Sequence, residues 1–94
     1  MIFGLFWGVI QKLQLPVSVI TSFNHQTGTT SPKQILYGGR RHNLIKAGYH
    51  HTFRQGRTLY HVFSMISEAM FFKLVLNTDN LIWTLEEVAD GNAS

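Results

Sequence analysis

The longest stretch of the chain without glycine or proline covers residues 57–90, and it contains the largely apolar segment 58–76. A helix over this segment would be long enough to cross a bilayer, since a helix rises about 1.5 Å per residue and spanning takes about 20 residues. The polar residues Arg57, His61, Ser64 and Glu68 follow one another at steps of four, three and four, which places them on one face of such a helix. The pattern therefore predicts a transmembrane helix with a polar stripe.

The carboxylate of Glu68 would make this helix only marginally stable in lipid. Nine Leu, Ile, Val and Phe residues lie between Leu59 and Leu76. Each contributes about −0.3 to −0.6 kcal/mol, whereas a central carboxylate costs roughly 2.5–3.5 kcal/mol. The helix is therefore expected to span a membrane inside an assembly, with its stripe packed on a larger membrane-protein subunit. The alternative is an amphipathic helix whose stripe faces water.

The chain before this helix shows no long regular element. Residues 1–32 open with an apolar and aromatic run of ten residues and end in a polar loop. The run is either a hydrophobic hook on a membrane or partner or the first element of a core. Alternating residues at 17–21 predict at most a short strand, because Pro16 and the polar loop flank them. Residues 33–57 are basic and aromatic, and their four glycines favour loops.

The chain after the helix is acidic. Residues 77–94 begin with a polar break, and Thr84 followed by Glu87 resembles a capping box, which predicts a short helix. Trp83 suits either an interfacial belt or a core contact. The whole pattern predicts a mainly α fold: one transmembrane helix over 58–76, a loop-rich basic N-terminal extension and a short acidic C-terminal helix.

Composition suggests a chain that depends on a partner or a membrane. The 94 residues include no cysteine, 45% are hydrophobic and 14% are charged, against about 25% charged in an average soluble domain. The lack of cysteine excludes disulfide bonds, thiolate metal sites and a cysteine nucleophile. A chain this short without such constraints is expected to need stabilisation from outside.

The charges are divided between the two ends of the chain. All eight Lys and Arg residues precede residue 74, and all five Asp and Glu residues follow residue 67. Such an asymmetry around an apolar stretch is typical of a single-span membrane protein whose basic side is not translocated. The alternative is chance segregation in a soluble chain with few charges.

Catalytic and metal-binding patterns are not found in the sequence. The five histidines have no HxxxH or HExxH spacing and no neighbouring carboxylate cluster, so a metal site is not expected. The first 67 residues contain no carboxylate, which leaves little room for paired-carboxylate or Ser-His-Asp chemistry. Gly38 and Gly39 predict a turn, without the spacing of a phosphate-binding loop. The sequence predicts no enzyme and no cofactor.

The basic segment 33–57 suits an anionic partner. Its Lys and Arg residues alternate with Tyr37, Tyr49, Phe53 and three histidines. Phospholipid headgroups would attract it by about 1 kcal/mol per basic residue. An RNA backbone would do the same, with bases stacking on the aromatic rings. The composition alone does not separate these two partners.

Three short matches resemble one known family. The run FRQGRT at 53–58, the run AMFF at 69–72 and the later Trp83 are similar to subunit 9 of the mitochondrial cytochrome bc1 complex. The resemblance implies a small single-span accessory subunit of a respiratory complex. It places Arg57 and Thr58 at the membrane entry, and it places the aromatic pair of the second run at the exit. It also implies an inner-membrane location, with the basic N-terminal side in the matrix and the acidic C-terminus in the intermembrane space.

Two functions are compatible with these patterns. The preferred one is a non-catalytic structural subunit that stabilises a respiratory-chain complex through contacts with larger subunits and with anionic phospholipid such as cardiolipin. Its expected contact residues are Arg54, Arg57, His61, Ser64 and Glu68. The alternative is a small basic RNA-associated protein of an organellar ribosome. In that case the basic segment contacts phosphates and the later helix is an ordinary amphipathic one.

Overall fold

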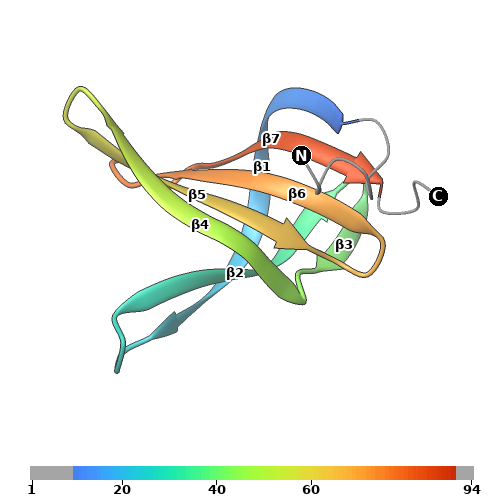
Figure 1. Ribbon diagram of the computed structural model, residues 1–94, viewed down its shortest axis with the longest axis horizontal. Helices are drawn as coiled ribbons and strands as arrows, with labels where there is room; N and C mark the ends of the chain where they lie inside the picture. Colours follow the sequence, from blue (N-terminus) through green and yellow to red (C-terminus); the bar gives the residue numbers. More distant parts are fainter. Residues whose placement is uncertain (1–9, 91–94) are drawn as a thin grey trace.

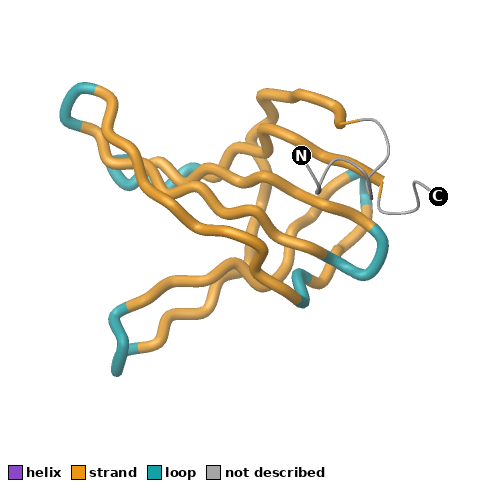
Figure 2. The backbone as a smooth tube through the Cα atoms, in the orientation of Figure 1, coloured by secondary structure: helices purple, strands orange, loops and turns teal. Residues whose placement is uncertain are grey.

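The computed structural model describes residues 10–90, which form strands and turns and contain no helix. The strands are β1 (Ile10–Asn24), β2 (Thr29–Tyr37), β3 (Arg40–Asn43), β4 (Lys46–Gln55), β5 (Thr58–Ile66), β6 (Met70–Asn77) and β7 (Trp83–Asp90). They form one antiparallel sheet in the order β3-β2-β1-β7-β6-β5-β4 (Figures 1 and 2). Apart from its last residue, the apolar run at 1–10 lies outside the described residues, so neither interpretation of it is tested.

Strand β1 belongs to both halves of the sheet. Its first part pairs with β7 and its second part pairs with β2, and each ladder shifts register once, between Lys12 and Leu15 and between Ile20 and Thr21. Register shifts of this kind bend a strand and increase its twist. The long bent β1 therefore carries β2 and β3 over one face of the β4–β7 part of the sheet (Figure 1).

The core lies between these two halves, on what we call the inner face of β4–β7. Its buried apolar side chains come from both halves: Ile35, Leu44, Phe63, Met65, Phe72, Leu74, Trp83, Leu85 and Val88. The ring of Phe72 lies edge-on to Tyr37 at 6.0 Å and 5.2 Å from the ring of His42, so strands that are not neighbours in the sheet meet here. The opposite face of β4–β7 is called the outer face.

Tight turns join consecutive strands. Gly38 and Gly39 both have positive φ, 63° and 74°, as a two-residue turn of type I′ requires, and they connect β2 to β3 as the sequence predicts for a turn. After β3 the chain bridges the two halves of the sheet. The amide of Leu44 donates to the carbonyl of Lys33 at 2.8 Å, and the amide of Ile45 donates to the carbonyl of Ile66 at 2.9 Å.

The predicted helix over 58–76 is wrong, because this stretch forms β5, a turn and β6. Both strands are buried on both faces: Val62 and Phe63 are adjacent and buried, as are Phe71 and Phe72. Such strands show no polar alternation, so their sequence resembles a continuous apolar segment. Ser67 makes the turn without glycine or proline, since its hydroxyl accepts from the amide of Met70 at 3.1 Å.

The other expectations of a mainly α fold are also wrong. The predicted acidic C-terminal helix is strand β7, whose Trp83 is buried in the core rather than placed at a membrane interface. The loop-rich basic segment 33–57 consists largely of β2, β3 and β4. Residues 10–90 include no helix that could cross a bilayer. The inner-membrane location that the resemblance implies, between matrix and intermembrane space, requires a single membrane-spanning helix, so that location is wrong as well.

Candidate functional site

Strand β4 lies at one edge of the sheet and is exposed along its whole length. Tyr49, His51 and Phe53 pair with Ser64, Val62 and Tyr60 of β5. Because side chains alternate between the faces of a strand, these three rings lie on one face. That face is the outer one, since the intervening His50 pairs with Phe63 of the core.

Four of these rings form what we call the ring row: Tyr49, His51, Phe53 and Tyr60. The rings of Tyr49 and His51 lie 5.2 Å apart. The rings of Phe53 and Tyr60 are stacked at 4.8 Å with planes only 10° apart. Tyr49 is 63% exposed and Phe53 is 40% exposed. The ring row therefore offers aromatic faces to a ligand without prior rearrangement of the core.

Gly48 determines which face of β4 carries the ring row. The register of β4 against β5 shifts between Ala47 and Tyr49, which leaves Gly48 without a partner. A Cβ atom at Gly48 would lie 3.3 Å from the backbone oxygen of Ser64, which is tighter than an ordinary contact. Glycine permits this close approach. Without the shift, the side chains that follow on β4 would change faces.

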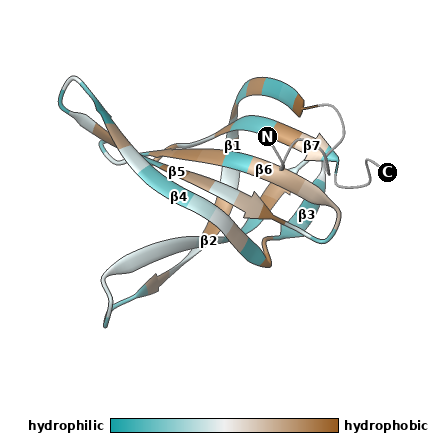
Figure 3. Cartoon of the chain, in the orientation of Figure 1, coloured by the Kyte–Doolittle hydropathy of each residue, from teal (hydrophilic) through white to brown (hydrophobic). Residues whose placement is uncertain are grey.

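Positive charge accompanies the ring row. Residues 10–66, which include β1 to β5, contain no acidic residue. Lys46 stands at the start of β4, while Arg54 and Arg57 stand at its far end, where the β4–β5 hairpin projects from the sheet (Figure 1). Figure 3 shows that hydrophilic residues are frequent on β4, in contrast to its neighbour β5. The edge strand is thus both aromatic and basic.

The middle of the outer face, over β6 and β7, carries a net negative charge, unlike the basic strand β4. Lys73 pairs with Glu87 across β6 and β7, but Leu74 pairs with Leu85, so Glu86 is an extra residue in β7. The register shift lets both carboxylates approach Lys73, at 3.8 Å for Glu86 and 3.6 Å for Glu87. All three side chains are partly exposed. An anionic ligand is consequently favoured at β4 and not over β7.

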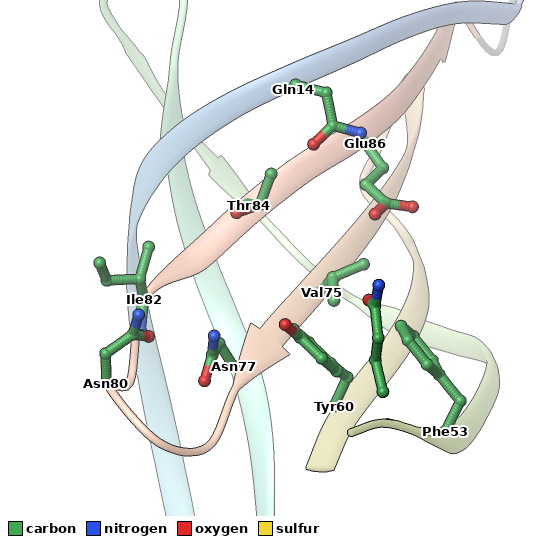
Figure 4. A pocket seen from close by; sticks show the side chains of 10 residues that line it. Gln14, Phe53, Tyr60, Val75, Asn77, Asn80, Ile82, Thr84 and Glu86 are labelled. Atoms are coloured by element: carbon green, nitrogen blue, oxygen red, sulfur yellow. The ribbon is translucent and has the colours of Figure 1, made fainter. Parts of the chain in front are cut away.

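A hollow of about 420 Å³ adjoins the ring row on the outer face. It is lined by side chains of β1, β4, β5, β6 and β7 and of the turn before β7: Gln14, Phe53, Gln55, Tyr60, Val75, Asn77, Asn80, Ile82, Thr84 and Glu86. Figure 4 shows Phe53 and Tyr60 side by side at one end of the hollow and Gln14 with Glu86 at the other. Its four amide groups can each donate and accept hydrogen bonds.

The residues expected to contact a partner do not share one face. Arg54 and Arg57 lie together at the β4–β5 hairpin, whereas Glu68 lies in the turn at the opposite end of β5. Along β5, His61 has the same orientation as the core residue Phe63, and Ser64 has the opposite one. A helix would have aligned these side chains, but a strand separates them. Ser64 pairs with Tyr49 on the outer face, and Arg57 lies in the turn at the end of the ring row, whereas Arg54 alternates with Phe53 and therefore starts from the inner face.

The inner face carries a histidine pair next to the core. Atom Nε2 of His50 and atom Nδ1 of His61 lie 2.9 Å apart in a hydrogen bond. The ring of His50 is also stacked on Phe63 at 4.4 Å. Partial burial lowers the pKa of His50 from its ordinary 6.5, and the neighbouring His61 and His51 lower it further. Within residues 10–90, no group of three or more His, Asp or Glu side chains is arranged to hold a metal ion.

Acidification is expected to destabilise the fold through His50. Its pKa is lower in the folded state than in the unfolded state, so the unfolded chain binds the proton more readily. Stability is therefore full above the unfolded value of 6.5, falls as the pH drops through it, and levels off below the folded pKa. Melting temperatures measured between about pH 8 and about pH 5 should show this decline.

A matched pair of variants separates His50 from the other histidines. His50→Gln removes the titrating group and should flatten the decline, while His25→Gln in the β1–β2 turn should leave it in place. An equally steep decline in both variants would mean that another group is responsible.

The sequence indicates the aromatic and basic character of 33–57 but not the ring row. Tyr49 and Phe53 stand out among its rings, but so does Tyr37, which points into the core against Phe72. Tyr60 falls within the stretch predicted to be a helix. Alternation along 49–53 is the signal that separates exposed from buried rings, once that segment is taken as a strand.

Comparisons with protein-family models, curated proteins and solved structures give no match to this chain.

Proposed function

We propose that this protein is a non-catalytic binding module that holds single-stranded RNA along the ring row of β4. The observation that carries the proposal is the ring row itself, in which exposed aromatic side chains alternate on one face of a basic edge strand. Proteins bind unpaired RNA by stacking bases on aromatic rings while cations contact the phosphates. Both parts of this chemistry occur together on β4.

The spacing of the rings suits an extended strand of RNA. Side chains two residues apart on a strand are about 6.6 Å apart, so Tyr49, His51 and Phe53 form a line of rings along β4. Stacking tolerates any base, because every base has a π-face. Lys46 stands at the start of this line and Arg57 in the turn at its end, where the phosphates of a bound strand would pass. Arg54 starts from the inner face, but β4 is the edge strand, so its long side chain can reach the same phosphates around the edge.

The hollow beside Phe53 and Tyr60 supports the same proposal. A base stacked at that end of the ring row would have its edge next to the amides of Gln55 and Asn77, which line the hollow. Amide side chains form paired hydrogen bonds with base edges. Among the described residues, no Lys or Arg lines the hollow, so a base rather than a phosphate is the moiety expected there.

The role that the sequence favours, a structural subunit of a respiratory-chain complex, stays a prediction. Its mechanism needs a helix that packs a polar stripe on a membrane subunit, and no such helix exists in residues 10–90. Contacts with partner subunits or with cardiolipin would have to use the exposed arginines of the β4–β5 hairpin. We therefore favour the RNA proposal, which uses side chains that the fold already brings together.

Salt dependence tests the electrostatic part of the proposal. The affinity for a fluorescently labelled oligouridylate should fall steeply between about 50 and about 200 mM salt, with a slope of about 0.7 per phosphate contacted. The double variant Arg54→Gln/Arg57→Gln should lower that slope by about 1.4, since it removes two cations. Lys12→Gln on β1 serves as the control and should leave the slope unchanged. Equal slopes for both variants, or equal affinity for duplex RNA, would contradict the proposal.

A further inference from the structure

A second cavity lies on the inner face, where the two hairpins of the sheet diverge (Figure 1). It has a volume of about 360 Å³, within the range of small-molecule sites. The tip of the β1–β2 hairpin forms one wall, and β4, β5, the end of β6 and the turn after it form the other. Its lining residues are Gly28, Thr29, Thr30, His50, His61, Phe63, Leu76, Thr78 and Leu81. We call this cavity the hairpin cleft.

The lining of the hairpin cleft is neutral and largely apolar. None of these lining residues is Lys, Arg, Asp or Glu. The rings of Phe63, His50 and His61 lie nearly parallel, with planes 7° to 17° apart. The lowered pKa of His50 favours its neutral form at neutral pH. Such a cleft excludes an ionic ligand and favours a flat apolar one.

The histidine pair supplies the polar contacts of the cleft. One ring nitrogen of each histidine is used in the bond between His50 and His61. If both rings are neutral, one of the two remaining nitrogens carries a hydrogen and the other has a free lone pair, whichever tautomers are present. The pair therefore offers one donor and one acceptor to a ligand, next to an apolar surface.

Leu81 provides an independent observation at the rim of the cleft. It has a φ of 63°, in the left-handed region, and within residues 10–90 no other non-glycine residue has a positive φ. A leucine in this conformation is strained, whereas glycine or asparagine adopts it easily. Its side chain is 70% exposed, so burial in the core does not compensate for the strain. Strain of this kind is found at ligand-binding sites, where an unusual side chain position is needed.

We propose that the hairpin cleft binds a small, neutral, aromatic molecule that carries one hydrogen-bonding group. The apolar walls and Leu81 cover the rings of the ligand, and its polar group bonds to the histidine pair. Because the cleft is on the inner face and the ring row is on the outer face, the two sites work independently, and this proposal does not depend on RNA binding.

The test uses N-phenyl-1-naphthylamine, a neutral aromatic amine whose fluorescence rises when it leaves water. The full chain should bind one molecule of this probe, and Leu81→Asn should weaken binding by about tenfold, because it replaces an apolar wall by an amide. Asparagine tolerates the backbone at this position, so the variant is expected to fold and to melt no earlier than the parent chain. Addition of oligouridylate should not displace the probe.

The neighbouring Ile82→Asn is the matched control. Ile82 is also apolar and is 48% exposed, but it lines the hollow on the outer face. This variant should bind the probe as the parent chain does. Binding of several probe molecules per chain would overturn the proposal, because the probe would then be adhering to exposed apolar side chains. Equal binding by the Leu81→Asn and Ile82→Asn variants would overturn it as well.

Discussion

Phe72→Ala should remove about 3–5 kcal/mol from the free energy of unfolding, which is the usual cost of deleting a buried aromatic ring. Phe72 is fully buried on β6, and its ring contacts Tyr37 and His42 of the other half of the sheet. A small domain has only about 5–15 kcal/mol of stability in total. The loss is therefore a large part of the total, and the variant is expected to unfold at a much lower urea concentration than the parent chain.

Urea unfolding followed by tryptophan fluorescence measures this effect, because Trp83 lies in the same core. Leu36→Ala is the control: Leu36 is 48% exposed on β2, so its loss should change stability by about 0.5 kcal/mol or less. A loss below about 1 kcal/mol for Phe72→Ala would contradict the packing of β2 and β3 over β6, since cavities in a closed core cost more.

The double variant Tyr49→Ala/Phe53→Ala should weaken binding of oligouridylate by about 10²–10⁴-fold, because each stacked base contributes about 1–3 kcal/mol. Both rings are exposed, so their removal should leave the core intact and the melting temperature close to that of the parent chain. Fluorescence polarisation at constant salt gives the affinity.

Leu15→Ala controls for the loss of exposed apolar surface in that experiment. Leu15 is 43% exposed on β1, away from β4, and the variant should bind the oligonucleotide as the parent chain does. Suppose that the Tyr49→Ala/Phe53→Ala variant also retained its affinity while the Arg54→Gln/Arg57→Gln variant lost affinity. The contact with RNA would then be purely electrostatic, and the ring row would have no part in it.

The fold is difficult to predict because apolar and polar residues do not alternate along its central strands. In β5 and β6, residues such as Val62, Phe63, Leu74 and Val75 are buried on both faces of the sheet. The period of two that reveals a half-exposed strand is lost there. The turn between them relies on the hydroxyl of Ser67, which is a far weaker sequence signal than glycine or proline.

Other parts of the fold have clearer signals in the sequence. Gly38 and Gly39 predict the turn that joins β2 to β3, and the polar break that opens 77–94 is the turn between β6 and β7. The short alternation at 17–21 indicates a strand, but Pro16 predicts an end to it. In the structure β1 continues through Pro16, which pairs with Thr84 between the register shift at 12–15 and the start of the β1–β2 ladder at Ser18. A proline inside a long strand is tolerated at such an irregular position.

The candidate site depends on information that the sequence does not show locally. The composition of 33–57 indicates a basic aromatic surface, but whether a ring faces solvent depends on strand phase, which the register shift at Gly48 changes. Tyr60 joins Phe53 only because β4 and β5 form a hairpin. Likewise, Arg57 and Glu68 would share one face of a helix but lie at opposite ends of β5.

The pairing of β1 with β7 has a consequence for the order of folding. It joins the first described strand to the last one, while β4 to β7 form a meander of sequence neighbours. Contacts between distant parts of a chain form slowly, because a long loop must close first. During synthesis the meander can assemble as its strands emerge, whereas β1 must wait for β7. Until then the apolar side of the nascent sheet is open, and this interval is when a chaperone would be most useful.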